Sequence, residues 1–441
     1  MTATARMSTV EFDRTLKPYP HYKESGVEWL GQVPEHWKVT KYSHCYKSGM
    51  GETILGTDLV DDGKIVVYSA TETEAVFGYV NSARILLEPD DLIIPARGNS
   101  IGHVKIVKEL CTTTQTTIYS KPLSSDKFLT RFIWYTLLAG REVLFYFDRT
   151  AIPQITVEQV QSNKIPFPPL AEQRAIAAFL DRETARLDTL ISRQQRLIEL
   201  SQEKRRALIG HAVTRGLDET APLKESGVEW LGQVPEHWKI TRLGFLAIVK
   251  ARLGWKGLKA DEYVDSGNIF LSTPDIKGTE IDYQNANFIT DERYLESPEI
   301  MLQEGDVLIA KDGSTLGTLN VVRSLPAPAT VNSSIAVLRP SSLIHSEFLG
   351  YFLRSEFTQN IIQRMKGGMG VPHLFQDDLK RFVILQPSLD EQSAIVAYLD
   401  DETAKIDTLI AKARRAIELM KEHRSALIAA AVTGQIDVRA E

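Results

Sequence analysis

The stretch KESGVEWLGQVPEHWK occupies residues 23–38, and the same sixteen residues return without one change at 224–239. A second segment, PLAEQRAIAAFLDRETARLDTLI (169–191), returns less strictly as SLDEQSAIVAYLDDETAKIDTLI (388–410). The sequences between these repeats differ. The chain is therefore two copies of one unit, each with a shared frame and a divergent middle. This pattern is typical of a molecule that recognises two different ligands.

Length and composition set broad limits. A chain of 441 residues predicts two to four domains, and 43% hydrophobic with 24% charged residues is ordinary for a globular protein. No run approaches the roughly 18 apolar residues of a membrane span, and the N-terminus lacks the apolar stretch of a signal peptide, so we expect a cytoplasmic location. The net charge of −6 argues weakly against nucleic-acid binding, because charge acts face by face.

The first repeated box combines apolar anchors with residues that interrupt regular structure. Trp29, Leu30, Val33 and Trp37 are apolar, and Pro34 lies among them. We expect a packed clasp that holds the start of each copy against the rest of its unit. The alternative is a tryptophan-lined box that binds a ligand.

The two divergent middles, 39–168 and 240–386, predict mixed α/β domains. Short apolar runs between turns predict strands, and longer runs with helical spacing predict helices. The expected strands are 64–70, 83–88 and 91–96 in the first middle and 268–272 and 306–310 in the second. The expected helices are 127–147 and 346–365.

Two segments of the first middle align weakly with two segments of the second. DLIIPARGNSIG (91–102) aligns with DVLIAKDGSTLG (306–317), each a strand followed by a glycine-centred turn. IPQITVEQVQSNKIPFP (152–168) aligns with VPHLFQDDLKRFVILQP (371–387). The middles are therefore expected to share a fold while their surfaces differ.

Two long helices are expected, at 170–213 and 389–432. Each would be about 66 Å long at 1.5 Å per residue, and its apolar stripe needs a partner. A pseudo-two-fold axis between the copies predicts that the two helices pair as an antiparallel coiled coil, with both chain termini at equivalent points. Gln194, Ser201 and His423 interrupt the stripe. The expected packing residues are Ile176, Leu180, Leu187, Leu190, Ile191, Leu197, Ile198, Leu208, Ile395, Leu399, Ile406, Leu409, Ile417, Met420 and Leu427.

Motifs of catalysis are not found in the sequence. It has no GxxxxGK[ST] loop for ATP and no GxGxxG dinucleotide loop. PFPPL (166–170) is only superficially similar to the tetrapeptide of adenine methylases. Cys45 and Cys111 are the only cysteines, and no histidine pairs with another ligand at a metal-binding spacing, so we expect no metal site.

Two variable regions, two long helices and boxes of the GVEWLGQVPEHW and PLAEQRAIAAFLD kind resemble the specificity subunit of a type I restriction-modification system. The resemblance covers residues from about 20 to 435. It implies an α/β (α+β) architecture of two target recognition domains joined by the two helices. The expected parts are a lead-in with the first recognition domain (1–168), helix one (169–215), the second recognition domain (216–386), helix two (387–435) and a tail (436–441).

The resemblance also implies the function. Each recognition domain would read one half of a split, asymmetric target in double-stranded DNA. The chain itself would be non-catalytic. It would dock two modification subunits, which methylate adenine N6 with S-adenosylmethionine, and restriction subunits that use ATP and Mg. The alternative is a coiled-coil scaffold that binds two different proteins and no DNA.

Candidate DNA contacts follow from the chemistry of recognition. Arg and Lys suit guanine, Asn and Gln suit adenine, and phosphates are bound by basic and hydroxyl side chains. Such residues gather at the glycine turns and at the polar stretches aligned between the middles. In the first middle they are Arg97, Asn99, Ser100, Lys105, Gln115, Arg149 and Gln154. In the second they are Arg252, Lys256, Lys259, Lys311, Ser314, Thr315, Asn332, Lys366 and His373.

Overall fold

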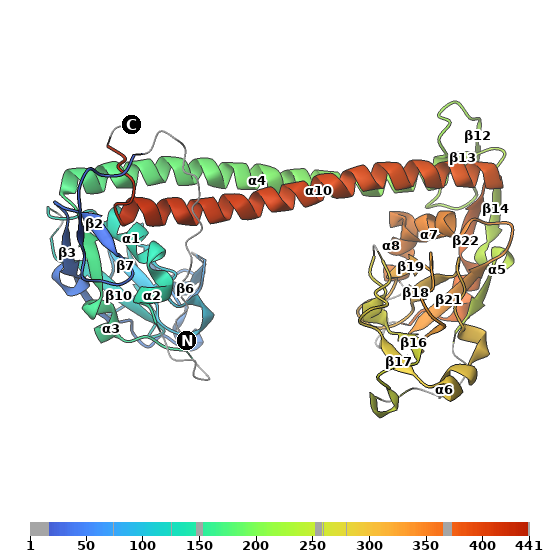
Figure 1. Cartoon of the computed structure of the whole chain (residues 1–441), viewed down its shortest axis with the longest axis horizontal. Helices are drawn as coiled ribbons and strands as arrows, with labels where there is room; N and C mark the ends of the chain where they lie inside the picture. The colour runs from blue at the N-terminus through green and yellow to red at the C-terminus, as the bar shows by residue number, and fades with distance from the viewer. Residues whose placement is uncertain are drawn as a thin grey trace. The chain divides into compact units, whose positions relative to one another are not determined.

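The computed structural model of the chain describes residues 17–73, 75–124, 126–146, 153–251, 258, 260–278, 280–364 and 373–439. The chain divides into two compact units (Figure 1). Unit 1 comprises Met1–Gln195 and Arg414–Glu441, and unit 2 comprises Arg196–Ala413. Each unit therefore contains part of both long helices. None of the helices in the described residues is long and apolar enough to cross a membrane.

Unit 1 contains short strands, short helices and part of each long helix. Its strands are β1 (Tyr22–Glu24), β2 (Gln32–Pro34), β3 (Lys38–Lys41), β4 (Tyr46–Met50), β5 (Ile65–Tyr68), β6 (Val76–Val80), β7 (Leu92–Pro95), β8 (Lys105–Ile106), β9 (Cys111–Thr113), β10 (Thr117–Pro122) and β11 (Lys164–Phe167). Its helices are η1 (Tyr42–His44), η2 (Gly56–Asp58), η3 (Gly98–Ser100), α1 (Thr130–Ala139), α2 (Arg141–Leu144), α3 (Val157–Ser162), the start of α4 (Leu170–Arg215) and the end of α10 (Leu389–Val432).

Unit 2 repeats the order of strands and has further short helices between them. Its strands are β12 (Leu223–Glu225), β13 (Gln233–Pro235), β14 (Lys239–Arg242), β15 (Ala247–Lys250), β16 (Asn268–Leu271), β17 (Asn287–Ile289), β18 (Val307–Ala310), β19 (Leu319–Val321), β20 (Ala329–Val331), β21 (Ile335–Pro340) and β22 (Val383–Gln386). Its helices are the end of α4, α5 (Leu243–Leu246), η4 (Ala260–Glu262), η5 (Thr273–Asp275), α6 (Asp291–Leu295), η6 (Pro298–Ile300), α7 (Ser346–Arg354), α8 (Glu356–Arg364), α9 (Gln376–Arg381) and the start of α10.

The strand order is the same in both units. The four-stranded sheet β4-β10-β7-β8 of unit 1 corresponds to β15-β21-β18-β19 of unit 2. The three-stranded sheets β6-β5-β9 and β17-β16-β20 correspond as well, and each holds one antiparallel and one parallel pair. This correspondence of the sheets confirms the expectation that the two middles share a fold.

Some local expectations need correction. Residues 83–88 form no strand. The carboxylate of Glu52 accepts the backbone N–H groups of Arg84 and Ile85, and Leu87 forms an isolated β-bridge with Cys111. The helix expected at 127–147 ends at Ala139 and resumes as α2 after Gly140. The helix expected at 346–365 breaks at Ser355, whose extended ψ of 147° separates α7 from α8.

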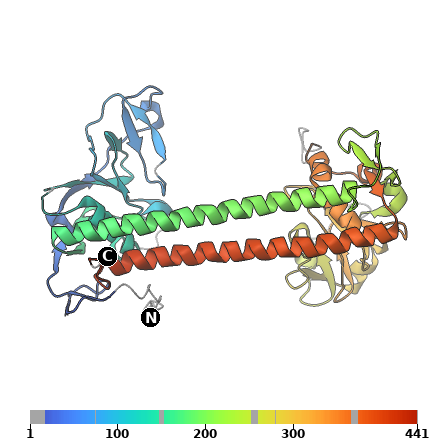
Figure 2. The same cartoon turned by 90° about the horizontal axis from the view of Figure 1, so that it is seen from above.

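The long helices α4 and α10 have 46 and 44 residues and confirm the expected spans. In unit 1 the first half of α4 lies beside the second half of α10 and runs antiparallel to it (Figures 1 and 2). Asp188 and Arg424 join them at 3.1 Å. In unit 2 the other halves are joined by Arg205 and Asp407 at 3.4 Å.

Most of the expected packing residues lie inside. Those that are buried are Ile176, Leu180, Ile395, Leu399, Ile406, Ile417 and Leu427. Those that are half-buried are Leu187, Leu190, Ile191, Leu197, Ile198, Leu208 and Met420. The prediction that Leu409 packs between the helices is wrong, because its side chain is 41% exposed while that of the adjacent Ile410 is 9% exposed. Each residue turns a helix by about 100°, so Leu409 falls beside the buried stripe that Ile406, Ile410 and Ala413 follow.

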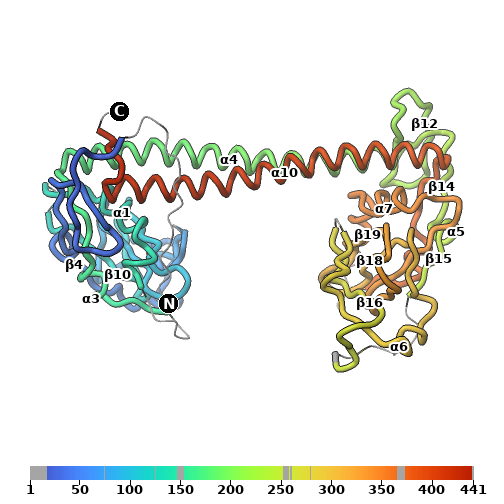
Figure 3. The backbone as a smooth tube through the Cα atoms, in the orientation of Figure 1, coloured from blue at the N-terminus to red at the C-terminus, as the bar shows by residue number. Residues whose placement is uncertain are grey.

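The repeated box forms the expected clasp in each unit. Leu30, Val33 and Trp37 are at most 3% exposed and join the core of unit 1. The identical residues Leu231, Val234 and Trp238 join the core of unit 2. In unit 1 the tail that follows α10 also lies against the N-terminal segment (Figure 3), with Asp437 N donating to the carbonyl of Lys17 at 2.8 Å.

Candidate nucleic-acid interface

A glycine turn follows the corresponding inner strand of the four-stranded sheet in each unit. After β7, Gly98 has φ 71° and Gly102 has φ 74°. After β18, Gly313 has φ 71° and Gly317 has φ 88°. These left-handed conformations favour glycine, which explains why the four positions coincide between the divergent middles. A Cβ atom added at Gly98 or Gly313 would meet no atom within 4 Å, so both turns border open space.

A second segment faces each turn, and the same backbone pairing holds it. In unit 1, Arg97 forms a β-bridge with Gln154, and Ile155 N donates to Ala96 O at 3.0 Å. In unit 2, Asp312 forms a β-bridge with His373, and Leu374 N donates to Lys311 O at 2.7 Å. Ile155 and Leu374 are fully buried and anchor the facing segments. The two stretches that the sequence alignment singled out are thus neighbours in space.

The chemistry of the turns differs between the units. Unit 1 presents the cation Arg97 beside the amide of Gln154. Unit 2 presents the carboxylate of Asp312 beside the imidazole of His373, whose Nδ1 lies 3.8 Å from an oxygen of Asp312. The exposed ring of Phe375 lies 4.5 Å from the His373 ring, measured between centroids. A shared backbone therefore carries two different sets of donors and acceptors.

Burial governs ionisation at the turn of unit 2. It lowers the pKa of the Lys311 ammonium, because a half-buried cation loses hydration. It also lowers the pKa of His373, and the nearby Lys311 charge adds to that effect. A lowered pKa favours the neutral imidazole, which can both donate and accept a hydrogen bond.

The other expected contact residues divide by exposure. Asn99, Gln115, Gln154 and Ser314 are exposed, while Arg97, Lys311, Thr315, Asn332 and His373 are half-buried. Ser100 and Lys105 are buried and need correction. Ser100 donates to the carbonyl of Ala70 at 2.8 Å, and Lys105 donates to Thr71 Oγ1 at 2.7 Å. These two residues shape unit 1 from within and are not placed to contact DNA directly. Arg149, Arg252, Lys256, Lys259 and Lys366 lie outside the described residues.

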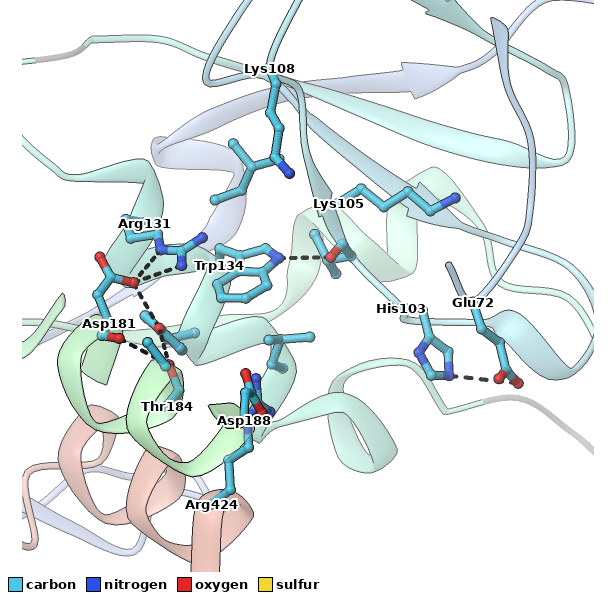
Figure 4. Close-up of a pocket in the computed structure, with 15 residues that line it drawn as sticks. Glu72, His103, Lys105, Lys108, Arg131, Trp134, Asp181, Thr184, Asp188 and Arg424 are labelled. Carbon is cyan, nitrogen blue, oxygen red and sulfur yellow. Dashed lines mark hydrogen bonds and ion pairs between the residues drawn. The ribbon is translucent and has the colours of Figure 1, made fainter. Parts of the chain in front are cut away.

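Lys105 lines a pocket of about 480 Å³ in unit 1 (Figure 4). Its cations are already bonded. Arg131 binds Asp181 at 2.7 Å and stacks on the Trp134 ring at 4.4 Å, and Arg424 binds Asp188. Trp134 Nε1 donates to the carbonyl of Val104 at 2.7 Å. The arginines that line the pocket are thus engaged in internal contacts, and Arg131 joins α1 to α4.

Two hydrogen-bonded side-chain pairs, one buried and one partly buried, were not found from the sequence. Glu172 accepts a hydrogen bond from Trp37 Nε1 at 2.7 Å, and Glu391 accepts one from Trp238 at 2.8 Å. The next residues, Gln173 and Gln392, accept the backbone N–H of Leu129 and His345. The Glu-Gln dipeptide that opens both helices was the available signal. Asp312, which a β-bridge places beside His373, is not among the predicted contacts, because those were chosen from basic, amide and hydroxyl side chains.

Comparisons with known proteins agree with one another. The family model of the type I restriction modification DNA specificity domain matches residues 34–200 and 235–419. The chain is 23% identical over 433 residues to the MjaVIII specificity subunit of Methanocaldococcus jannaschii, covering 95% of this chain and 97% of that protein. It is 26% identical over 286 residues to the EcoKI specificity subunit of Escherichia coli strain K12, covering 62% of this chain and 57% of that protein.

Solved structures share the fold. One chain comes from a study of complex assembly and conformational transition of the type I R-M system. It has a TM-score of 0.70 at 17% identity, with 91% of this chain and 98% of that chain covered. The HsdS subunit from Thermoanaerobacter tengcongensis has a TM-score of 0.53 at 16% identity, with 91% and 98% covered.

Proposed function

The chain belongs to the family of type I restriction-modification DNA specificity proteins, and we propose that it reads a two-part DNA target, one part with each unit. It is a specificity subunit and has no catalytic role of its own. The observation that carries the proposal is the pair of glycine turns, which share backbone geometry and differ in chemistry. Two units that read the same DNA sequence would not need different side chains at equivalent turns.

The arrangement of the long helices is part of the proposal. We infer that α4 and α10 form an antiparallel coiled coil in which equivalent residues of the two copies exchange places. Two observations support this. The residue numbers of both ion pairs, Asp188 with Arg424 and Arg205 with Asp407, total 612. The buried positions 399, 403, 406, 410, 413 and 417 advance by alternate steps of three and four, which is the spacing of a coiled-coil seam.

The partners are proposed from the repeated box. Exposed residues usually tolerate substitution within about 0.5 kcal/mol, so stability does not explain why they are identical in both copies. Glu28 and Glu35 are exposed in unit 1, and Glu229 and Glu236 are exposed in unit 2. We propose that these exposed glutamates help to dock one modification subunit on each unit. The restriction subunits would join that assembly, and S-adenosylmethionine, ATP and Mg would be bound by the partners.

Sequencing of modified adenines tests the proposed function. In cells that carry this chain with its modification subunit, we expect methylated adenines in one asymmetric sequence with two defined parts and a fixed unread gap. A gel shift of the same complex with DNA of that sequence should show tight binding that a random pool does not match. Absence of both sequence-specific methylation and DNA binding would instead favour the scaffold that binds two proteins.

Charge reversal in the box tests the docking surface. Glu28→Lys should weaken binding of the modification subunit to unit 1 by roughly tenfold or more, because like charges would then face each other across the interface. Native mass spectrometry should show one bound modification subunit in place of two. Glu28→Lys with Glu229→Lys should leave none. Glu304→Lys, at an exposed residue outside the box, is the matched control and should leave two.

A further inference from the structure

We propose that the two residues bridged at each glycine turn are the base-reading pair of that unit. In one half-site Arg97 would contact guanine and Gln154 would contact adenine. In the other half-site Asp312 with His373 would contact a base that presents an amino group, and cytosine is the base we expect. This inference rests on the proposed function and adds to it the position and chemistry of readout. Asp312 enters as a specificity-determining residue.

The backbone supports the assignment. Residues opposite each other in an antiparallel bridge place their side chains on one face, with Cβ atoms about 4.5–5.5 Å apart. Arg97 and Gln154 are such a pair, and so are Asp312 and His373. In each pair the next residue along the chain after the first member is the glycine with φ 71°. The two pairs are therefore equivalent positions, and only their side chains differ.

The residues at the end of each turn are held by hydrogen bonds from a neighbouring helix, whereas the bridged pair at its start lies beside open space. Arg141 Nε donates to the carbonyl of Ile101 at 2.9 Å in unit 1. Gln359 Nε2 donates to the carbonyl of Gly317 at 3.1 Å in unit 2. By contrast, open space lies over Gly98 and Gly313. A rigid turn with an open face fulfils the need of direct readout for donors and acceptors that are positioned in advance.

The first pair suits a purine step. Within the described residues Arg97 forms no ion pair with a carboxylate, and its Nε is buried without a hydrogen-bond partner. A guanidinium that is not committed to a carboxylate can donate two hydrogen bonds to O6 and N7 of guanine. Gln154 is exposed and has the amide that pairs with N6 and N7 of adenine.

The second pair has the opposite polarity. The Asp312 carboxylate only accepts hydrogen bonds, so it suits the N4 amino group of cytosine. The ionisable groups that act on its partner His373 are Lys311, Asp312 and Asp378. Lys311 supplies a positive charge one residue before Asp312, which offsets the repulsion between that carboxylate and DNA phosphates. The exposed ring of Phe375 offers an apolar contact beside the pair.

The test is the methylated sequence made by variants of the full complex. Arg97→Ala should lower the preference for guanine at one position of one half-site by roughly 5- to 150-fold, and leave the other half-site unchanged. Asp312→Asn should change the preferred base at one position of the other half-site from cytosine to adenine, because an amide both donates and accepts. Gln154→Ala probes the first pair again at an exposed residue, in case Arg97→Ala does not fold.

Asp265→Asn, at an exposed aspartate of unit 2, is the matched control and should keep both half-sites. Unchanged half-sites in Asp312→Asn and in Gln154→Ala, with normal DNA affinity, would overturn the inference and leave the proposed function standing. A wild-type complex that neither binds nor methylates a defined sequence would overturn the proposed function itself.

Discussion

Replacing Trp37 with alanine is expected to destabilise unit 1 by about 3–5 kcal/mol. The indole is fully buried and meets the Tyr19 ring at a centroid distance of 5.8 Å. Alanine leaves a large cavity and removes the donor that Glu172 accepts at 2.7 Å. A buried carboxylate that loses a hydrogen bond adds to the cost of the cavity. The measurement is hydrogen exchange by mass spectrometry, with faster exchange expected in peptides of unit 1.

The duplicated box provides controls for this prediction. Trp238→Ala should produce a similar loss confined to unit 2, because Trp238 is also fully buried and donates to Glu391. Trp29→Ala should cost less, since its side chain is only half-buried. A loss below about 1 kcal/mol in both Trp37→Ala and Trp238→Ala would show that the box is not a structural clasp. That outcome would favour the alternative of a tryptophan-lined ligand box.

Removal of residues 433–441 should destabilise unit 1 by about 3–6 kcal/mol, because two apolar side chains lose their burial. Ile436 is 4% exposed and Val438 is 5% exposed, and both join the core that contains Trp37. Tyr22 also donates to the carbonyl of Gly434 at 3.0 Å, and that bond would be lost. Urea denaturation should show a lower midpoint for the transition of unit 1.

Point variants separate the tail's packing from its length. Ile436→Ala should reproduce about 2–4 kcal/mol of the loss, whereas Gln435→Ala, at an exposed neighbour, should change stability by less than about 0.5 kcal/mol. Gly434→Ala should also destabilise, because a Cβ there would lie 2.3 Å from Cδ of Pro34 at a φ of 74°. Unchanged stability after removal of the whole tail would contradict its place in the core.

Much of the candidate site could be predicted because its signals are local. The strand before each turn and the glycines within it follow from apolar runs and from backbone conformations that only glycine adopts easily. The segments that face the turns could be aligned between the two middles, but the sequence did not show that they lie beside the turns. The β-bridge between Arg97 and Gln154 joins positions 57 residues apart. The burial of Lys105 depends on Ser69 and Thr71, which no local pattern connects to it.

The sequence by itself determined the duplication, the long helices and the glycine turns, because each is written in neighbouring residues through repetition, period or backbone preference. The tertiary structure alone decided which side chains meet. It buried Ser100 and Lys105, left Leu409 exposed beside Ile410, and brought Asp312 to His373. Such contacts depend on how distant segments pack, and packing is set by the combined shape of the core, which no single stretch of chain contains.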